Sequence, residues 1–135
     1  MALSSKGGVH RSTVTGTRGM VASAHPLASL AGTRMLLSGG NAFDAVVATA
    51  AALNVVEPFM SGIAGVGFAL IYDATKKERR LLDYTGRTPG AARPELFTDV
   101  QMKERGITSC LVPGACAGWM ELLEQYGRLS AARSD

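Results

Sequence analysis

The chain has 135 residues and a mass of 14.1 kDa; 47% of its residues are apolar, 19% are charged and 6% are aromatic. This length fits one globular domain. A mean hydropathy of +0.14 provides enough apolar surface to offset the entropy of ordering, which excludes an intrinsically disordered chain. The net charge of +3 falls well short of the clustered charge of a dedicated nucleic-acid binder, so we expect no nucleic-acid partner.

The longest apolar run, residues 45–56, is 12 residues long, contains Asn54 and is followed by Glu57 and Pro58. A membrane-spanning helix needs about 20 apolar residues, so the run predicts a buried helix and no membrane span. Residues 1–19 contain no apolar segment of the kind found in a secretory signal. The cytoplasm is therefore the default expectation; an incomplete N-terminus would open the periplasm or the extracellular space instead.

The residue types that most often bind metals are few. Cys110 and Cys116 match neither a CxxC redox pair nor a zinc-finger spacing, and we expect both to be buried thiols. His10 and His25 have no second His, Cys or carboxylate at metal-ligand spacing. The sequence thus predicts no metal site and no cofactor.

The first predicted helix follows a polar arm. Residues 1–18 are rich in Ser, Thr, Gly and basic side chains and lack apolar periodicity, so we expect a flexible N-terminal arm. His25 and Pro26 then open a helix, because proline suits the first helical turn, where its missing N–H costs nothing. Gly39 and Gly40 end this helix, since glycine readily adopts the positive φ found beyond a last turn.

A second predicted helix begins at once. Asn41 is a good N-cap, and Asp44 can reach back to it while its charge faces the positive end of the helix dipole. The helix should run to about Asn54, because Glu57 and Pro58 stop it. Its surface is apolar nearly all round and rich in small residues, which predicts close neighbours on more than one side.

A glycine-rich loop over residues 62–67, here called the glycine loop, follows this helix. Its glycines, Gly62, Gly65 and Gly67, form a GxxGxG pattern before a strand, whereas a dinucleotide-binding fingerprint is GxGxxG between a strand and a helix. We interpret the glycine loop as a place of close backbone packing or as the lining of a site.

The rest of the chain predicts a hairpin and one or two helices. Residues 68–72 form a continuous apolar strand of the kind covered on both faces, and a second strand completes a β-hairpin over residues 66–84. Residues 94–106 carry a weaker helical pattern. A last helix opens at Val-Pro-Gly, residues 112–114, and ends at Gly127.

Most charged residues have structural explanations. The basic run at residues 76–80 lies in the hairpin turn and is typical of a solvated tip rather than a phosphate site. Four carboxylates lie at helix or strand ends, where a cap or solvent contact explains them better than an acid/base pair does. These carboxylates are Asp44, Glu57, Asp73 and Asp83.

Arg87 differs from the other charged residues. It lies among Gly, Thr and Pro just past a strand, in what we call the strand-end loop (residues 83–89), where a guanidinium can present its rigid fork to a carboxylate. No Ser, Cys or Thr comes with a recognisable base and orienting partner. The residue types therefore indicate a candidate binding residue without a complete nucleophile system.

The motifs occur in a distinctive order. They are GMVASAHPLAS at 19–29, GGNAFDA at 39–45, VEP at 56–58, SGIAGVGF at 61–68 and VPGACAG at 112–118. This order resembles the N-terminal part of the large subunit of γ-glutamyltranspeptidases, also called γ-glutamyltransferases or glutathione hydrolases, and the resemblance covers residues 19–127. Residues 128–135 lack the family's usual continuation, as expected of a truncated end.

The resemblance implies an α+β fold, the four-layer αββα sandwich of N-terminal-nucleophile hydrolases, with only its N-terminal portion present. It also implies a precursor that cleaves itself into a large and a small subunit, with a Thr at the new N-terminus as nucleophile. That Thr hydroxyl, activated by its own α-amine, would attack the γ-glutamyl amide of glutathione while backbone donors hold the oxyanion. The glutamyl group would then pass to water, an amino acid or a dipeptide.

The resemblance assigns no catalytic residue to this chain, because the implied nucleophile lies beyond residue 135. The implied partners are glutathione or another γ-glutamyl compound, and the small subunit of the same precursor. Without the rest of the precursor, the chain is expected to be inactive.

The family's large subunit contributes an Arg that binds the glutamyl α-carboxylate, in a loop that often reads Asp-Phe-Arg-Glu-x-Ala-Pro. The strand-end loop here reads Asp-Tyr-Thr-Gly-Arg-Thr-Pro, so Thr85 occupies the Arg position and Arg87 stands two residues later. In an extended strand, side chains two residues apart point to the same face and lie about 6.6 Å apart along the strand. Arg87 is therefore the candidate substrate-binding residue.

Three hypotheses stay open. The chain is part of a γ-glutamyltransferase, or part of an acylase-like homologue with the same fold and another acyl substrate, as the Gly-Arg-x-Pro loop suggests. The third is a non-catalytic, free-standing interaction domain. Against the third, a fragment cut from a larger core leaves apolar patches uncovered, and the apolar second helix and strand 68–72 predict such patches.

Overall fold

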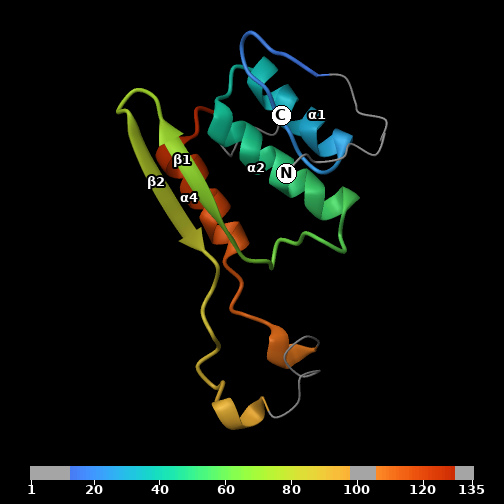
Figure 1. Cartoon of the computed structure of the whole chain (residues 1–135), viewed down its shortest axis with the longest axis vertical. Coiled ribbons are helices and arrows are strands. Elements are labelled where there is room, and N and C mark those ends of the chain that lie inside the picture. The colour runs from blue at the N-terminus through green and yellow to red at the C-terminus, as the bar shows by residue number, and fades with distance from the viewer. Residues whose placement is uncertain (1–12, 98–105, 130–135) are drawn as a thin grey trace, which may run out of the picture.

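The computed structural model describes residues 13–97 and 106–129. Its elements in chain order are α1 (Pro26–Leu37), α2 (Ala42–Val56), β1 (Gly67–Asp73), β2 (Glu78–Tyr84), two 3₁₀ turns (Pro94–Leu96 and Ile107–Ser109) and α4 (Ala115–Tyr126). Figure 1 shows α1 beside α2, and α4 against one face of the β1–β2 hairpin. The described residues between β2 and α4, 85–97 and 106–114, carry both 3₁₀ turns and extend away from this body.

The two N-terminal helices begin and end where local signals predict. His25 caps α1 through its Nδ1, which accepts a hydrogen bond from the backbone N–H of Leu27 at 3.2 Å. Gly39, just past α1, has a φ of 88°. Asn41 and Asp44 form the predicted capping box at the start of α2, and α2 ends at Val56, two residues beyond the predicted Asn54.

α2 packs on α1 on one side and on α4 and the hairpin on the other, which confirms the prediction of neighbours on more than one side. The contact with α1 is close at Gly32, where a Cβ atom would lie 2.8 Å from the carbonyl oxygen of Ala45. Small residues on both helices therefore allow the backbones to approach.

The predicted hairpin is confirmed, with Leu70 opposite Leu81 in an antiparallel register. Successive side chains of a strand point to opposite faces. Ile71 points inward and is only 5% exposed, in a core with Val47, Trp119 and Leu122. This inner face of the hairpin is covered by α2 and α4.

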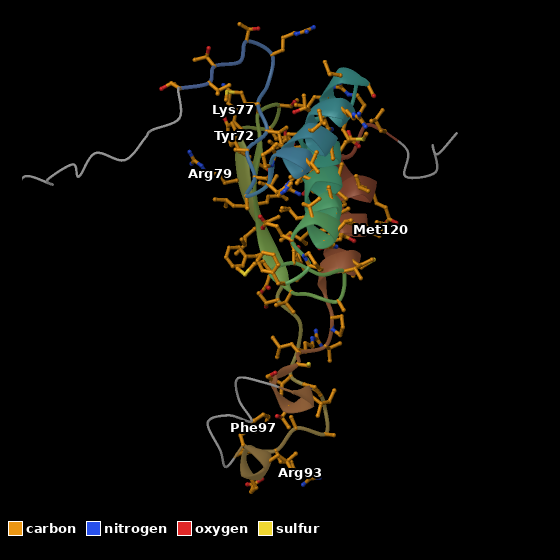
Figure 2. All side chains as sticks on the ribbon, turned by 90° about the vertical axis from the view of Figure 1, so that its right-hand side faces the viewer. Tyr72, Lys77, Arg79, Arg93, Phe97 and Met120 are labelled. Carbon is orange, nitrogen blue, oxygen red and sulfur yellow. The ribbon has the colours of Figure 1, made fainter. Side chains whose placement is uncertain are left out.

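The prediction that residues 68–72 are covered on both faces is wrong for this chain. Leu70 is 78% exposed, and Phe68, Tyr72 and Leu81 are exposed with it. Figure 2 shows Tyr72 and Arg79 projecting from the hairpin on the side away from the helices, where the Arg79 guanidinium lies 5.8 Å from the centre of the Tyr72 ring. A two-stranded hairpin with helices on one side leaves its other face open.

The weak helical pattern at residues 94–106 stays a prediction for residues 98–105, which lie outside the described residues; Pro94–Leu96 forms a 3₁₀ turn. The expectation about the two cysteines is wrong. Cys110 and Cys116 are exposed free thiols rather than buried ones. Cys110 lies in the segment between β2 and α4, and Cys116 lies in the first turn of α4.

The end of α4 is tied to the start of α2. The side-chain amide of Asn41 donates to the carbonyl oxygen of Tyr126 at 2.6 Å. The carboxylate of Asp44 accepts from the backbone N–H groups of Arg128 and Leu129, at 3.0 and 3.1 Å. The capping box therefore also holds a segment more than 80 residues away in sequence.

Some predictions fall largely outside the part of the chain that the structure describes. They concern the N-terminal arm at residues 1–18, His10 and the end at residues 128–135. The domain boundaries stay predictions. Among the helices in residues 13–97 and 106–129, none is long and apolar enough to cross a membrane.

Candidate functional site

Three segments meet where β2 ends and α4 begins. The carbonyl oxygen of Gly65, in the glycine loop, accepts hydrogen bonds from the backbone N–H groups of Gly114 and Ala115, at 3.1 and 3.0 Å. The backbone N–H of Val112 donates to the carbonyl oxygen of Arg87, in the strand-end loop, at 2.9 Å. The glycine loop and the strand-end loop are thus both joined to the residues that open α4.

Glycine is required at this junction because the backbones pass close to each other. Gly86 has a φ of 81°, and a Cβ there would clash with the carbonyl oxygen of Val112. Gly114 and Gly118 lie against the backbone and the ring of Tyr84 with no room for a Cβ. Sequence reasoning expected close packing at the glycine loop but missed this second set. The Gly-x-x-x-Gly spacing of Gly114 and Gly118, where α4 begins, was a signal for two of these three glycines.

Arg87 lies on the surface of this junction. Its backbone carbonyl is held by Val112, whereas its exposed guanidinium forms no hydrogen bond or ion pair with any residue of the described ranges. A planar guanidinium that is free of partners has its full set of donors available for a carboxylate.

Thr85, two residues before Arg87, is held differently. The carboxylate of Asp83 accepts from the backbone N–H of Thr85 at 2.9 Å and from its hydroxyl at 2.7 Å. These hydrogen bonds, the backbone one first, lower the pKa of Asp83 below its usual 3.8, because they stabilise the charged form. The Thr85 hydroxyl is therefore engaged within the strand-end loop.

The other carboxylates have the structural roles predicted for them. Asp44 caps α2, Glu57 lies at its C-cap, and Asp73 accepts from the backbone N–H groups of Thr75 and Lys76 in the hairpin turn. No three His, Cys, Asp or Glu side chains gather into a metal-binding group in residues 13–97 and 106–129.

The basic hairpin tip is exposed, as expected of a solvated turn. Arg80 pairs with Glu78 at 2.8 Å and donates to the hydroxyl of Tyr126 at 3.2 Å. These two hydrogen bonds, the one to Glu78 first, raise the pKa of Arg80 above its usual value. Arg80 is thus committed to internal contacts, unlike Arg87.

A hollow of about 420 Å³ lies beside the glycine loop. Its lining includes Ser61, Gly62, Gly65, Tyr84 and Trp119, and Arg87 is not part of it. The structure therefore joins the glycine loop and the strand-end loop through the backbone, but it does not bring Arg87 and this hollow into one pocket. His25, the described histidine, uses its Nδ1 to cap α1.

Comparison with known proteins decides the family. A model of the gamma-glutamyltranspeptidase family matches residues 28–134. The chain belongs to this family. It is 45% identical over 122 residues to the glutathione hydrolase proenzyme of Bacillus subtilis (strain 168), covering 85% of this chain and 21% of that protein. It is 42% identical over 130 residues to the acylase ACY 1 proenzyme of Pseudomonas sp. (strain V22), covering 87% of this chain and 23% of that protein.

The fold agrees with the family. The gamma-glutamyltranspeptidase of Helicobacter pylori superposes with a TM-score of 0.82 at 37% identity, covering 88% of this chain and 36% of that chain. The α+β fold class predicted from the motifs is therefore confirmed, with a part of the N-terminal-nucleophile hydrolase fold present. The chain spans about a fifth of the length of the curated relatives it matches.

Proposed function

We propose that this chain is the N-terminal part of the large subunit of a self-processing γ-glutamyltransferase or glutathione hydrolase. The observation that carries the proposal is the 45% identity to a glutathione hydrolase proenzyme over most of this chain. The word proenzyme in that name fits a precursor that is cleaved into subunits. The catalytic Thr and the small subunit would come from the rest of the precursor.

In this proposal Arg87 binds the carboxylate of the acyl donor. Its support is local: an exposed guanidinium without a described partner, on a loop whose backbone is held by Val112. A charge-assisted, bidentate pair of this kind orients a substrate as well as binding it. The amide of a γ-glutamyl compound would then be placed for attack by a nucleophile that this chain does not contain.

An acylase-like homologue is the second candidate, and a specific observation favours it. The chain is nearly as similar to an acylase proenzyme, at 42% identity, as to the glutathione hydrolase proenzyme. The position of Arg87 also favours the acylase, because Thr85 stands where the glutamyl-binding Arg of the family's usual loop is expected. Acyl-donor specificity is thus the finer question within one reaction class.

The first experiment asks whether the reading frame extends past Asp135 and what its product becomes. We would express the complete product and record intact masses with N-terminal sequencing of each species. Two polypeptides, the smaller beginning with Thr, are expected from self-processing. A single species of 14.1 kDa would contradict the proposal and leave the free-standing domain as the better description.

The second experiment compares substrates. If both polypeptides form, turnover of glutathione is measured beside turnover of glutaryl and β-lactam amides. Preference for glutathione supports the glutathione hydrolase, and preference for the amides supports the acylase. The isolated 135-residue chain is the matched control, and we expect it to leave a γ-glutamyl anilide intact.

The free-standing domain is tested on the isolated chain itself. We expect this chain to bind a hydrophobic dye or to aggregate, because the outer face of the hairpin exposes Phe68, Leu70 and Tyr72. A monodisperse monomer that melts cooperatively and ignores the dye would favour the interaction domain instead.

A further inference from the structure

We propose that Asp83 is a positioning residue for Arg87, holding the strand-end loop in the conformation that presents the guanidinium. This inference rests on the proposed role of Arg87 in binding the acyl donor. It concerns a side chain that touches neither the substrate nor the reacting atoms and acts through the loop.

The first part of the argument is the closure of the loop at its start. Both donors of Thr85, the backbone N–H and the hydroxyl, are bound by the same carboxylate oxygen of Asp83, at 2.9 and 2.7 Å. A side chain that binds the backbone two residues further on closes an Asx turn, here strengthened by the charge of the acceptor and by the second bond. The chain direction after β2 is therefore set by Asp83.

The second part is the closure of the loop at its far side. Gly86, at a φ of 81°, turns the chain against the backbone of Val112, and the carbonyl of Arg87 accepts from the N–H of Val112 at 2.9 Å. The backbone of Arg87 is thus held from both directions, by Asp83 through Thr85 and by the segment that opens α4. Only the side chain of Arg87 keeps its freedom.

Such a held loop has a physical advantage for binding. A loop that is already in its bound conformation loses less conformational entropy when the ligand arrives, so more of the interaction energy appears as affinity. Removal of the Asp83 carboxylate would leave Arg87 present and charged but its backbone less defined. We therefore expect weaker binding of the acyl donor with little change in the chemical step.

The hairpin offers a matched control at the opposite end. Asp73 closes the same kind of turn at the end of β1, accepting from the backbone N–H groups of Thr75 and Lys76 at 2.9 and 3.2 Å. Both carboxylates lie on one hairpin, but only Asp83 borders Arg87. Asp73→Ala therefore reports what the loss of an Asx turn does to the hairpin alone.

The experiment measures kcat and KM for a γ-glutamyl anilide, or for the amide turned over fastest, with the complete processed enzyme. Arg87→Ala is expected to raise KM about tenfold or more, and Asp83→Ala about threefold to tenfold with kcat nearly unchanged. Asp83→Ala combined with Arg87→Ala should be no worse than Arg87→Ala alone, since Asp83 acts through Arg87. Asp73→Ala should leave KM unchanged.

Conservative variants separate positioning from folding. Asp83→Asn keeps an oxygen acceptor for the Thr85 N–H, and Thr85→Ser keeps both donors, so both should recover most of the affinity, whereas Thr85→Val should not. Additive effects of Asp83→Ala and Arg87→Ala, or equal effects of Asp83→Ala and Asp73→Ala, would overturn the positioning role alone. An unchanged KM in Arg87→Ala would remove the proposed role of Arg87 and this inference with it.

Discussion

The two faces of the β1–β2 hairpin differ although they come from alternate residues of the same strands. Ile71 is 5% exposed on the inner face, whereas its neighbour Leu70 is 78% exposed on the outer face. Both are large and apolar, so composition does not explain the difference. The inner face meets α2 and α4, and the outer face meets nothing within the described residues. The outer face is therefore the side of the hairpin that the described residues leave uncovered.

The largest expected effect lies on the inner side. Leu122, which is 2% exposed, packs against Ile71 and Trp119, so Leu122→Ala should cost about 2–5 kcal/mol through lost burial and the cavity left behind. Leu70→Ala on the outer face is the matched control and should change the unfolding free energy of this chain by about 0.5 kcal/mol or less. Urea unfolding of the two variants, at a protein concentration below that at which the chain aggregates, checks the comparison.

The same pair of variants sharpens the comparison in the complete precursor. If the rest of the protein covers the outer face, Leu70→Ala should become costly there while Leu122→Ala stays costly. Equal and small effects of Leu70→Ala in both the chain and the precursor would contradict the idea that the outer face is buried in the complete fold.

A smaller loss of stability is expected where the hydrogen bonds of Asp44 join the start of α2 to the residues after α4. Asp44 is 4% exposed and accepts from the backbone of Asn41, Arg128 and Leu129. Asp44→Ala would leave these N–H groups without their acceptor, at a cost of about 1–3 kcal/mol. Thermal unfolding of Asp44→Ala is compared with that of Asp73→Ala, which removes an exposed Asx turn. Equal losses of stability in the two variants would show that the long-range hydrogen bonds of Asp44 contribute little.

The smallest expected effect concerns Asp83, on the exposed side. Its pKa is lowered in the folded chain, mainly by the Thr85 backbone N–H and then by the Thr85 hydroxyl. The folded state therefore binds fewer protons than the unfolded state, so this stabilisation is present above the usual pKa of 3.8 and is lost as the pH falls through the lowered value. Asp83→Asn should remove this part of the acid sensitivity, seen as a flatter melting temperature between about pH 5 and about pH 3. An identical pH profile in wild type and variant would contradict it.

Much of the fold was predictable because the signals are local. The caps of α1 and α2 and the end of α1 at Gly39 depend on residues within a few positions of each other. The hairpin followed from one apolar run, a polar turn and a second strand after it. The family was predictable too, because several short motifs in a fixed order are specific even when each one is weak.

The candidate site was less predictable. Arg87 could be singled out by its neighbours, and its role stays a proposal. The two hydrogen bonds between Asp83 and Thr85 are local, but an Asp two residues before a Thr also occurs in ordinary turns. The spacing therefore did not indicate a functional loop. The second set of close approaches, at Gly86, Gly114 and Gly118, depends on which segments meet, so glycine content alone did not reveal it.

Local chemistry thus accounts for where helices and strands begin and end, and the motif order accounts for the family. Contacts between distant segments settled the rest: which face of β1 is buried, that both cysteines are exposed, and that the carboxylate of Asp44 also binds the backbone beyond α4. The physical reason is that a cap or a turn is stabilised by its own neighbours in sequence, whereas burial and close approach depend on which surfaces are brought together. When a strand has apolar residues on both faces, its sequence does not indicate which face the rest of the chain will cover.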